Sequence, residues 1–248
     1  MCYAFDLLTS APMTADLIAD IMNKVSVKVP DGWTCWAYSN HDCQRHTSRW
    51  NLTPAAQKLM LSLMMCLRGS ACIYQGEELG FTEADLSFED LQDPYGIQFW
   101  PEFKGRDGCR TPMAWSPDNQ HGGFSTATDT WLPVYDRHLH GAAATQENDP
   151  DAIVHHYRRA IAFRHAHSAL TKGAMSHVIA HDNVVTFTRT HAGSEMFCAF
   201  NLSDTASAID GPAGNWTPTG EEIDGANISG DGKIHLGPWR AYFALKAR

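Results

Sequence analysis

Two short apolar segments, each running into a cluster of polar residues, constrain the fold of this chain more than any other feature. The first, residues 33–38, leads into Asn40-His41-Asp42. The second, residues 71–74, leads into Gln75-Gly76-Glu77-Glu78, with a predicted helix between the two. Short apolar runs rich in aromatic and β-branched residues predict buried strands. The sequence therefore predicts a βαβ unit whose polar strand ends lie at one edge of a parallel sheet.

Capping residues and apolar periodicity predict three helices. The first follows Thr14 and repeats apolar side chains at the spacing of one helix face. The second follows Thr53-Pro54, a pair typical of a helix start, and is expected to end at Gly69. The third is expected to start at Asp149-Pro150. Its predicted buried face consists of Ile153, Val154, Tyr157 and Ile161.

The period of the pattern changes after about residue 170. Short strands separated by turn residues are predicted at residues 175–179, 184–189, 196–201, 233–236 and 239–245. That pattern is typical of an antiparallel β-sandwich. The predicted fold class is therefore α/β plus all-β. The α/β part spans residues 1–170, with a long irregular segment at about 80–148, and the all-β part spans residues 171–248.

Composition excludes several classes of partner and ligand. A formal net charge of −9 and a pI near 5.7 argue against a nucleic-acid or anionic-membrane partner. The seven cysteines include no C-x-x-C pair, so buried free thiols are expected, with no metal site and no cofactor. The N-terminal residues do not resemble a signal peptide, and no apolar run reaches ~20 residues, which favours a cytoplasmic location.

Four motifs between residues 40 and 113 resemble one known family. They are Asn40-His41-Asp42, the Tyr-Gln-Gly-Glu-Glu-Leu-Gly run at 74–80, the Asp-Leu-Gln-Asp-Pro run at 90–94, and the Gly-Arg-Asp-Gly-Cys-Arg-Thr-Pro-Met run at 105–113. Their order is similar to that in the α-glucosidase branch of the α-amylase superfamily, glycoside hydrolase family 13. The resemblance matches the C-terminal part of that family. It implies the last strands and helices of a (β/α)₈ TIM barrel followed by a C-terminal β-sandwich domain, in a fragment or a truncated gene product.

The resemblance implies a retaining, exo-acting α-glucosidase that releases glucose from the non-reducing ends of oligosaccharides. Such enzymes use a carboxylate nucleophile and a carboxylic acid on either side of the glycosidic bond. The family adds a third carboxylate that stabilises the transition state, and Asp42 matches it. His41 and Arg110 match the family residues that bind the glucose ring. The expected ligand is a small oligosaccharide or glucoside.

The motifs of the nucleophile and of the general acid are absent from the sequence. Gly105-Arg106-Asp107 does not match the nucleophile motif, because it follows the last predicted barrel strand. The chain alone is therefore expected to be inactive. A chain that supplies the missing N-terminal part of the barrel is a candidate partner.

Several alternatives stay open at this point. By spacing alone, Glu77 and Asp42 could be a catalytic carboxylate pair, whereas the resemblance makes residues 75–78 structural. His41 could only complete a strand end, and Arg110 could form a rim ion pair with Asp107 or exchange roles with Arg106. The parent protein could instead be a glucosyl-transferring or sucrose-directed relative, or the chain a non-catalytic, truncated sugar-binding protein.

Overall fold

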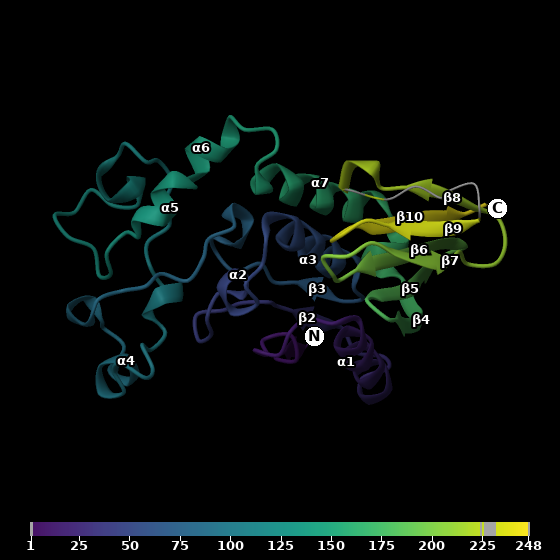
Figure 1. The fold of residues 1–248 in the computed structure, drawn as a ribbon, viewed down its shortest axis with the longest axis horizontal. Coiled ribbons are helices and arrows are strands. Elements are labelled where there is room, and N and C mark those ends of the chain that lie inside the picture. The colour runs from purple at the N-terminus through teal and green to yellow at the C-terminus, as the bar shows by residue number, and fades with distance from the viewer. Residues whose placement is uncertain (1, 224, 226–231, 248) are drawn as a thin grey trace.

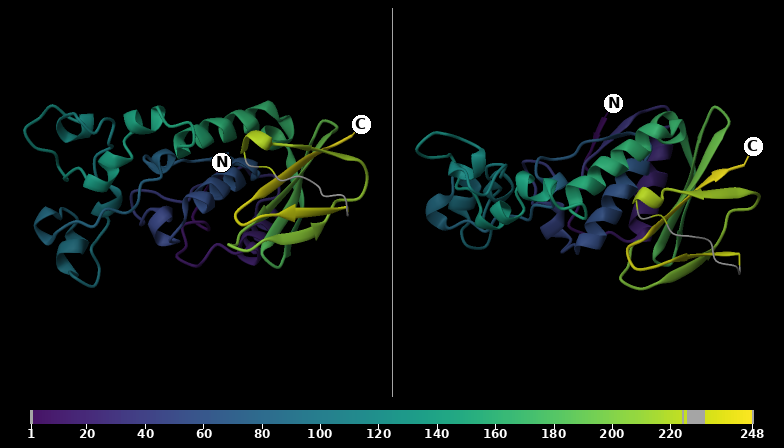
Figure 2. Two further views of the ribbon diagram at one scale, coloured as in Figure 1. Left: turned by 45° about the horizontal axis from the view of Figure 1, so that its top comes forward. Right: turned by 90° about the horizontal axis from the view of Figure 1, so that it is seen from above.

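The chain forms a three-stranded parallel sheet with helices packed beside it and, at one end of the molecule, a larger antiparallel sheet (Figure 1). The computed structural model describes residues 2–223, 225 and 232–247. In the described part of the chain, no helix is long and apolar enough to cross a membrane. The antiparallel sheet lies at one end of the molecule, and the irregular segment projects from the opposite end (Figure 2).

The parallel sheet confirms the predicted βαβ unit. Its strands are β1 (Cys2–Ala4), β2 (Thr34–Trp36) and β3 (Ser70–Ala71), in the order β1-β2-β3. Helix α1 (Ala15–Lys28) connects β1 to β2, while α2 (His46–Arg49) and α3 (Pro54–Cys66) connect β2 to β3. One face of the sheet packs against the helices, and the opposite face exposes side chains such as Tyr3.

The prediction of a second strand over residues 71–74 was wrong in its extent. β3 contains only Ser70–Ala71, although the N–H of Cys72 still donates to the Trp36 carbonyl at 2.8 Å. The N–H of Tyr74 donates instead to Glu77 Oε2 at 3.2 Å. The backbone therefore turns away from the sheet and enters a 3₁₀ helix at Glu77–Leu79.

Both predicted N-caps are present, but the expected end of the second helix was wrong. The hydroxyls of Thr14 and Thr53 each accept a backbone N–H in the first turn of α1 and α3, respectively. α3 ends at Cys66, and Gly69 lies beyond it with φ +139°. A Cβ on Gly69 would lie 2.3 Å from the Thr34 carbonyl. Gly69 thus permits close approach of the chain to β2 rather than capping the helix.

The third predicted helix, α7, spans Ile153–Ala166 and starts later than expected. The Asp149 carboxylate accepts the N–H of Asp151 at 3.0 Å, which holds the preceding residues in a turn. Of the predicted buried face, only Tyr157 is fully buried. The buried face is rotated, because the side chains packed inward are those of His156, Tyr157, Ala160, Phe163 and Arg164.

The segment between residues 80 and 148 is largely irregular and contains three short α-helices and three 3₁₀ turns. The α-helices are α4 (Pro94–Gln98), α5 (Asp136–His140) and α6 (Ala143–Glu147). Two small apolar clusters stabilise it, one around Phe81 and one around Leu91. α4 and α5 lie in separate lobes of this segment (Figure 1).

The C-terminal part forms a five-stranded antiparallel sheet in the order β4-β5-β6-β10-β8 and a two-stranded sheet of β7 and β9. All five predicted strands are present, and β7 and β8 were not predicted. The strands and the helix α8 that precedes them have the following bounds: α8 (Ser168–Lys172), β4 (Ala174–His181), β5 (Val184–His191), β6 (Ser194–Asn201), β7 (Ser207–Asp210), β8 (Trp216–Thr219), β9 (Lys233–Leu236) and β10 (Ala241–Lys246).

The cysteines are free thiols in varied surroundings. Cys66, Cys109 and Cys198 are buried, as expected for small apolar side chains. Cys72, which lies in an apolar run of the sequence, is exposed because the face of the parallel sheet opposite the helices is uncovered. Among the residues described, no group of three or more His, Cys, Asp and Glu side chains is placed to hold a metal ion.

A buried histidine on α5 makes the stability of the irregular segment depend on pH. The His138 ring stacks on Phe81 with centroids 4.1 Å apart, and Nε2 donates to the Thr82 carbonyl at 2.8 Å. Nδ1 is buried without a hydrogen-bond partner. Burial lowers the pKa of His138 to about 4, so the imidazolium form is disfavoured in the folded state.

We expect the wild-type chain to lose about 3 kcal/mol of stability relative to His138→Phe as pH falls from 7 to 4. The folded pKa lies below the unfolded value near 6.5, so the unfolded state binds the proton first. The stabilisation is complete above pH 6.5 and is lost as pH falls towards 4. Urea unfolding of both proteins at several pH values measures the difference. Parallel curves for the two proteins would contradict the assignment, since all other groups titrate alike in both.

Candidate functional site

The loop after β2 carries two of the predicted site residues and is held by short hydrogen bonds. Oδ1 of Asn40 accepts the backbone N–H of Asp42 at 2.8 Å. Oγ of Ser39 accepts the N–H of His46 at 2.9 Å, which ties the loop to α2. Asx turns of this kind fix the backbone locally. The loop therefore presents His41 and Asp42 from the carboxyl end of a parallel strand, where α/β proteins place their chemistry.

The structure brings Asp42, His41 and Arg110 together. Nη2 of Arg110 donates to Asp42 Oδ1 at 3.1 Å, and Nε donates to the His41 carbonyl at 2.7 Å. Nε2 of His41 lies 3.2 Å from Asp42 Oδ2. The Asp42 side chain is 52% exposed, so it is open to a ligand from solvent. A carboxylate flanked by a guanidinium and an imidazole is suited to binding sugar hydroxyls.

A second guanidinium, that of Arg106, reaches the same carboxylate; Arg106 was predicted only as an alternative to Arg110. Nη1 of Arg106 donates to Asp42 Oδ1 at 3.0 Å. Nε and Nη2 of Arg106 form a two-pronged pair with the Asp93 carboxylate at 2.8 and 2.9 Å. These bonds hold the pKa of Asp93 well below its ordinary value. Arg106 and Arg110 thus act together, four residues apart in one loop, rather than exchanging roles.

Asp107 anchors this loop and is not the ion-pair partner of Arg110. Its side chain is fully buried, and Oδ2 accepts the N–H groups of Gln92 and Asp93 at 2.7 and 2.6 Å. The loop also packs closely at Gly105, which has φ +77° and whose Cβ would lie 2.8 Å from the Gly96 Cα. Loop 105–110 therefore points its arginines towards Asp42 and its aspartate into the protein.

Glu77 is buried and does not face the site. Its side chain is 2% exposed, and Oε1 lies 3.2 Å from Nδ1 of His46. The neighbouring Glu78 accepts the N–H of Gly76 at 2.9 Å. A carboxylate enclosed in this way cannot reach a glycosidic bond, so a catalytic pair of Glu77 with Asp42 is excluded. Both glutamates stabilise the turn after β3, as the structural interpretation predicted.

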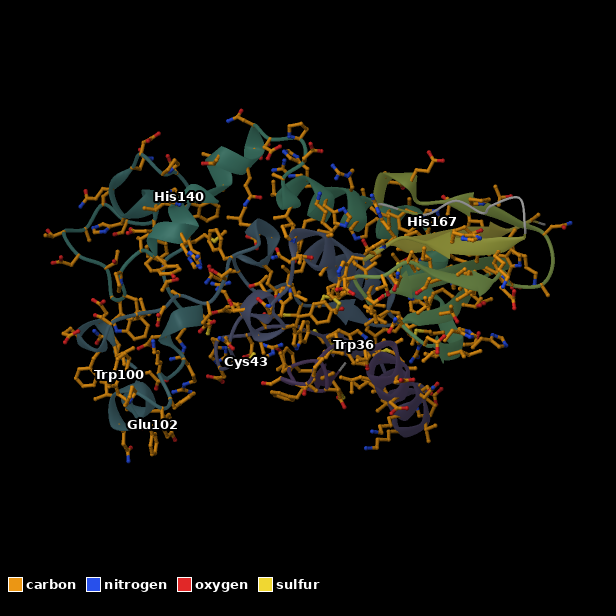
Figure 3. All side chains as sticks on the ribbon, viewed as in Figure 1. Trp36, Cys43, Trp100, Glu102, His140 and His167 are labelled. Atoms are coloured by element: carbon orange, nitrogen blue, oxygen red, sulfur yellow. The ribbon has the colours of Figure 1, made fainter. Side chains whose placement is uncertain are left out.

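A cleft of about 530 Å³ opens beside Asp42. The loop after β2, the segment around Glu83 and residues 102–106 form its walls. Cys43, which lines the cleft next to Asp42, lies between the body of the molecule and the lobe that carries Trp100 and Glu102 (Figure 3). The site therefore sits where the irregular segment meets the parallel sheet.

Comparison with characterised families and proteins finds clear sequence similarity over most of the chain. The family "Alpha amylase, catalytic domain" matches residues 5–173. A probable alpha-glucosidase of Rhizobium meliloti (strain 1021) is 47% identical over 256 residues, which cover 100% of this chain and 45% of that protein. An oligo-1,6-glucosidase of Heyndrickxia coagulans is 31% identical over 223 residues, 80% of this chain and 40% of that protein. The chain thus spans less than half the length of these relatives.

Solved structures show the same fold. The alpha-glucosyl transfer enzyme XgtA superposes with a TM-score of 0.91 at 38% identity, covering 99% of this chain and 46% of that one. The trehalose-6-phosphate hydrolase of Bacillus licheniformis superposes with a TM-score of 0.82 at 21% identity, covering 99% of this chain and 51% of that one. At 21% identity the second match shows the fold alone.

Proposed function

The chain belongs to the α-amylase catalytic-domain family, and from this premise we propose that it forms the glucose-binding part of a retaining, exo-acting α-glucosidase. The observation that carries the proposal is the Asp42 carboxylate, held by two guanidinium groups and the imidazole of His41. Relatives named as an α-glucosidase and an oligo-1,6-glucosidase support a glucosidic substrate. The activity of the whole protein is part of the proposal, because the chain spans less than half of those relatives.

In the proposed mechanism this chain stabilises the transition state but supplies neither reacting carboxylate. Retaining hydrolysis passes through an oxocarbenium-like transition state between a nucleophile and a general acid. The negative charge of Asp42 opposes the positive charge that develops on the sugar ring. His41 and Arg110 donate hydrogen bonds to glucose hydroxyls and fix the ring for attack. The nucleophile and the acid come from barrel strands outside this chain.

The proposed architecture follows from the parallel sheet. β1, β2 and β3 are the last three strands of a (β/α)₈ barrel in residues 1–170, and residues 171–248 form a separate antiparallel β-sandwich domain. A barrel of this kind requires eight strands. The exposed sheet face, with Tyr3 and Phe5 on or next to β1, supports the proposal, because in a complete barrel that face packs against the other strands. The N-terminal part of such a barrel is the proposed partner.

Glucosyl transfer is a second candidate function. It is favoured by the 38% identity to a solved alpha-glucosyl transfer enzyme over 99% of this chain. Hydrolysis and transfer share the covalent intermediate and differ in whether water or a sugar hydroxyl attacks it. Product analysis of the complete barrel with maltose or sucrose as donor distinguishes them. Free glucose in excess supports hydrolysis, and transfer products in excess support the second function.

Calorimetry with maltose tests whether the folded chain itself binds sugar. We expect Arg110→Gln to weaken binding by about tenfold, because it removes a charge-assisted hydrogen bond from the site. Arg158→Gln is the control, since Arg158 forms an exposed ion pair with Glu147 on α7 and α6. No heat from the wild-type chain would count against sugar binding by this chain alone. Equal affinities of wild type and Arg110→Gln would contradict the role of Arg110.

A further inference from the structure

We infer that Arg106, fixed by the buried carboxylate of Asp93, is a positioning residue that orients the Asp42 carboxylate and leaves Oδ2 of Asp42 to the sugar. The inference deepens the proposed function and rests on it for the identity of the ligand. The positioning itself rests on contacts of this chain alone.

The anchor of the arrangement is Asp93. Its side chain is fully buried, and Oδ2 accepts both the backbone N–H and Nε of Arg106 at 2.8 Å. Oδ1 accepts Nη2 of Arg106 at 2.9 Å and the N–H of Tyr95 at 3.3 Å. The N–H of Asp93 itself donates to Asp107 Oδ2. A buried carboxylate with this many donors has no alternative rotamer that keeps them all.

The Arg106 guanidinium is fixed on three sides. Its two-pronged pair with Asp93 sets the plane of the group, and Cζ lies 5.3 Å from the centre of the Tyr95 ring. Nη1 is left to point outward, where it donates to Asp42 Oδ1 at 3.0 Å. Since a guanidinium is rigid and planar, fixing one edge also fixes the position of Nη1. Asp93 therefore orients the Asp42 carboxylate through the Arg106 guanidinium.

The two oxygens of Asp42 consequently differ. Oδ1 accepts N–H groups from Arg106 and Arg110 at 3.0 and 3.1 Å. Two donors occupy the in-plane acceptor sites of one carboxylate oxygen. Among the residues that the structure describes, Oδ2 has the Nε2 atom of His41 as its one side-chain partner, at 3.2 Å. Oδ2 and the His41 ring therefore form the side of the carboxylate that is open to a sugar hydroxyl.

Lysine is the sharpest replacement for Arg106. It keeps the positive charge, but a single ammonium on a flexible stem cannot hold Asp93 at two points and Asp42 at a third. Asp93→Asn is the complementary change, since it keeps the shape of the anchor and removes its charge. Arg158→Lys is the matched control. Arg158 forms the same two-pronged pair with Glu147, at 2.9 and 2.7 Å, away from Asp42.

Carboxylate labelling of the purified chain tests the positioning without any requirement for activity. Asp42 is activated with a carbodiimide, coupled to glycine ethyl ester and quantified by mass spectrometry of its peptide. We expect labelling of Asp42 to rise about fivefold in both Arg106→Lys and Asp93→Asn, because one charged hydrogen bond is lost at a half-exposed site. In Arg158→Lys it should stay at the wild-type level. Labelling of Asp42 at the wild-type rate in both test variants overturns the inference.

Kinetics of the complete barrel distinguish failure of the inference from failure of the proposed function. We expect Arg106→Lys to lower kcat roughly 100-fold with KM within about threefold, the pattern of a misplaced group that acts in the transition state. If the wild type is active and neither Arg106→Lys nor Asp93→Asn lowers kcat, the inference is overturned and the proposed function stands. An inactive wild type overturns the function, and the labelling result still decides the inference.

Discussion

Asp42→Asn is expected to lower kcat of the complete barrel by on the order of 10³-fold, or about 4 kcal/mol of transition-state stabilisation. The substitution keeps the shape of the side chain and removes the charge that opposes the oxocarbenium-like transition state. In the wild-type chain, Arg106 and Arg110 both donate to Oδ1 of the Asp42 carboxylate. The substitution replaces that carboxylate with a neutral amide between the two guanidinium groups. The loss should fall mainly on kcat, because the charge matters most when the sugar becomes cationic.

The control for this prediction is Asp85→Asn. Asp85 also lines the cleft beside Asp42, but its side chain is 71% exposed and pairs with Lys104 at the surface. The same chemical change there should leave kcat within about twofold, since an exposed ion pair contributes little. Steady-state hydrolysis of p-nitrophenyl α-glucoside provides the measurement. If Asp42→Asn turned over substrate at a rate close to that of the wild type, the proposed role of Asp42 in stabilising the transition state would be contradicted.

The sequence predicted some, but not all, of the residues that meet around Asp42. Asp42, His41 and Arg110 were predicted from motifs that resemble a known family, and the structure places them in contact. A contribution of Arg106 alongside Arg110 was not predicted, because its partner Asp93 lies in a separate motif. No periodic pattern joins residues on two irregular loops. The alternative that Arg106 and Arg110 exchange roles was the available signal that a second arginine of this loop could reach the site.

Fold elements were predicted well where local chemistry decides them and less well where tertiary contacts do. The caps at Thr14 and Thr53 are local and are present in the structure. β3 is shorter than expected because the Glu77 carboxylate takes a backbone N–H that would otherwise extend the ladder. β8 (Trp216–Thr219) was missed because a four-residue edge strand with proline has little pattern of its own.

A second large effect is expected at Arg189, which joins the antiparallel sheet to the helical layer. Its side chain is fully buried on β5 and donates to the carbonyls of Cys66, Leu170 and Gly173. No carboxylate contacts it among the described residues, and burial lowers its pKa to about 10, so it stays cationic at neutral pH. The Cys66 carbonyl belongs to the C-terminal end of α3, where the helix dipole favours a cation.

Arg189→Met should lower the free energy of unfolding by about 3–5 kcal/mol and the Tm by roughly 10 °C. Methionine fills much of the volume, but it leaves three buried backbone carbonyls without a donor, and backbone groups cannot be replaced by apolar ones. Arg159→Met is the matched control, because the Arg159 side chain donates to the Glu222 carbonyl near the surface. Urea unfolding followed by circular dichroism measures both variants. Equal stability of Arg189→Met and Arg159→Met would contradict this prediction. It would mean that the hydrogen bonds from Arg189 to the carbonyls of Cys66, Leu170 and Gly173 do not stabilise the contact between the antiparallel sheet and the helices.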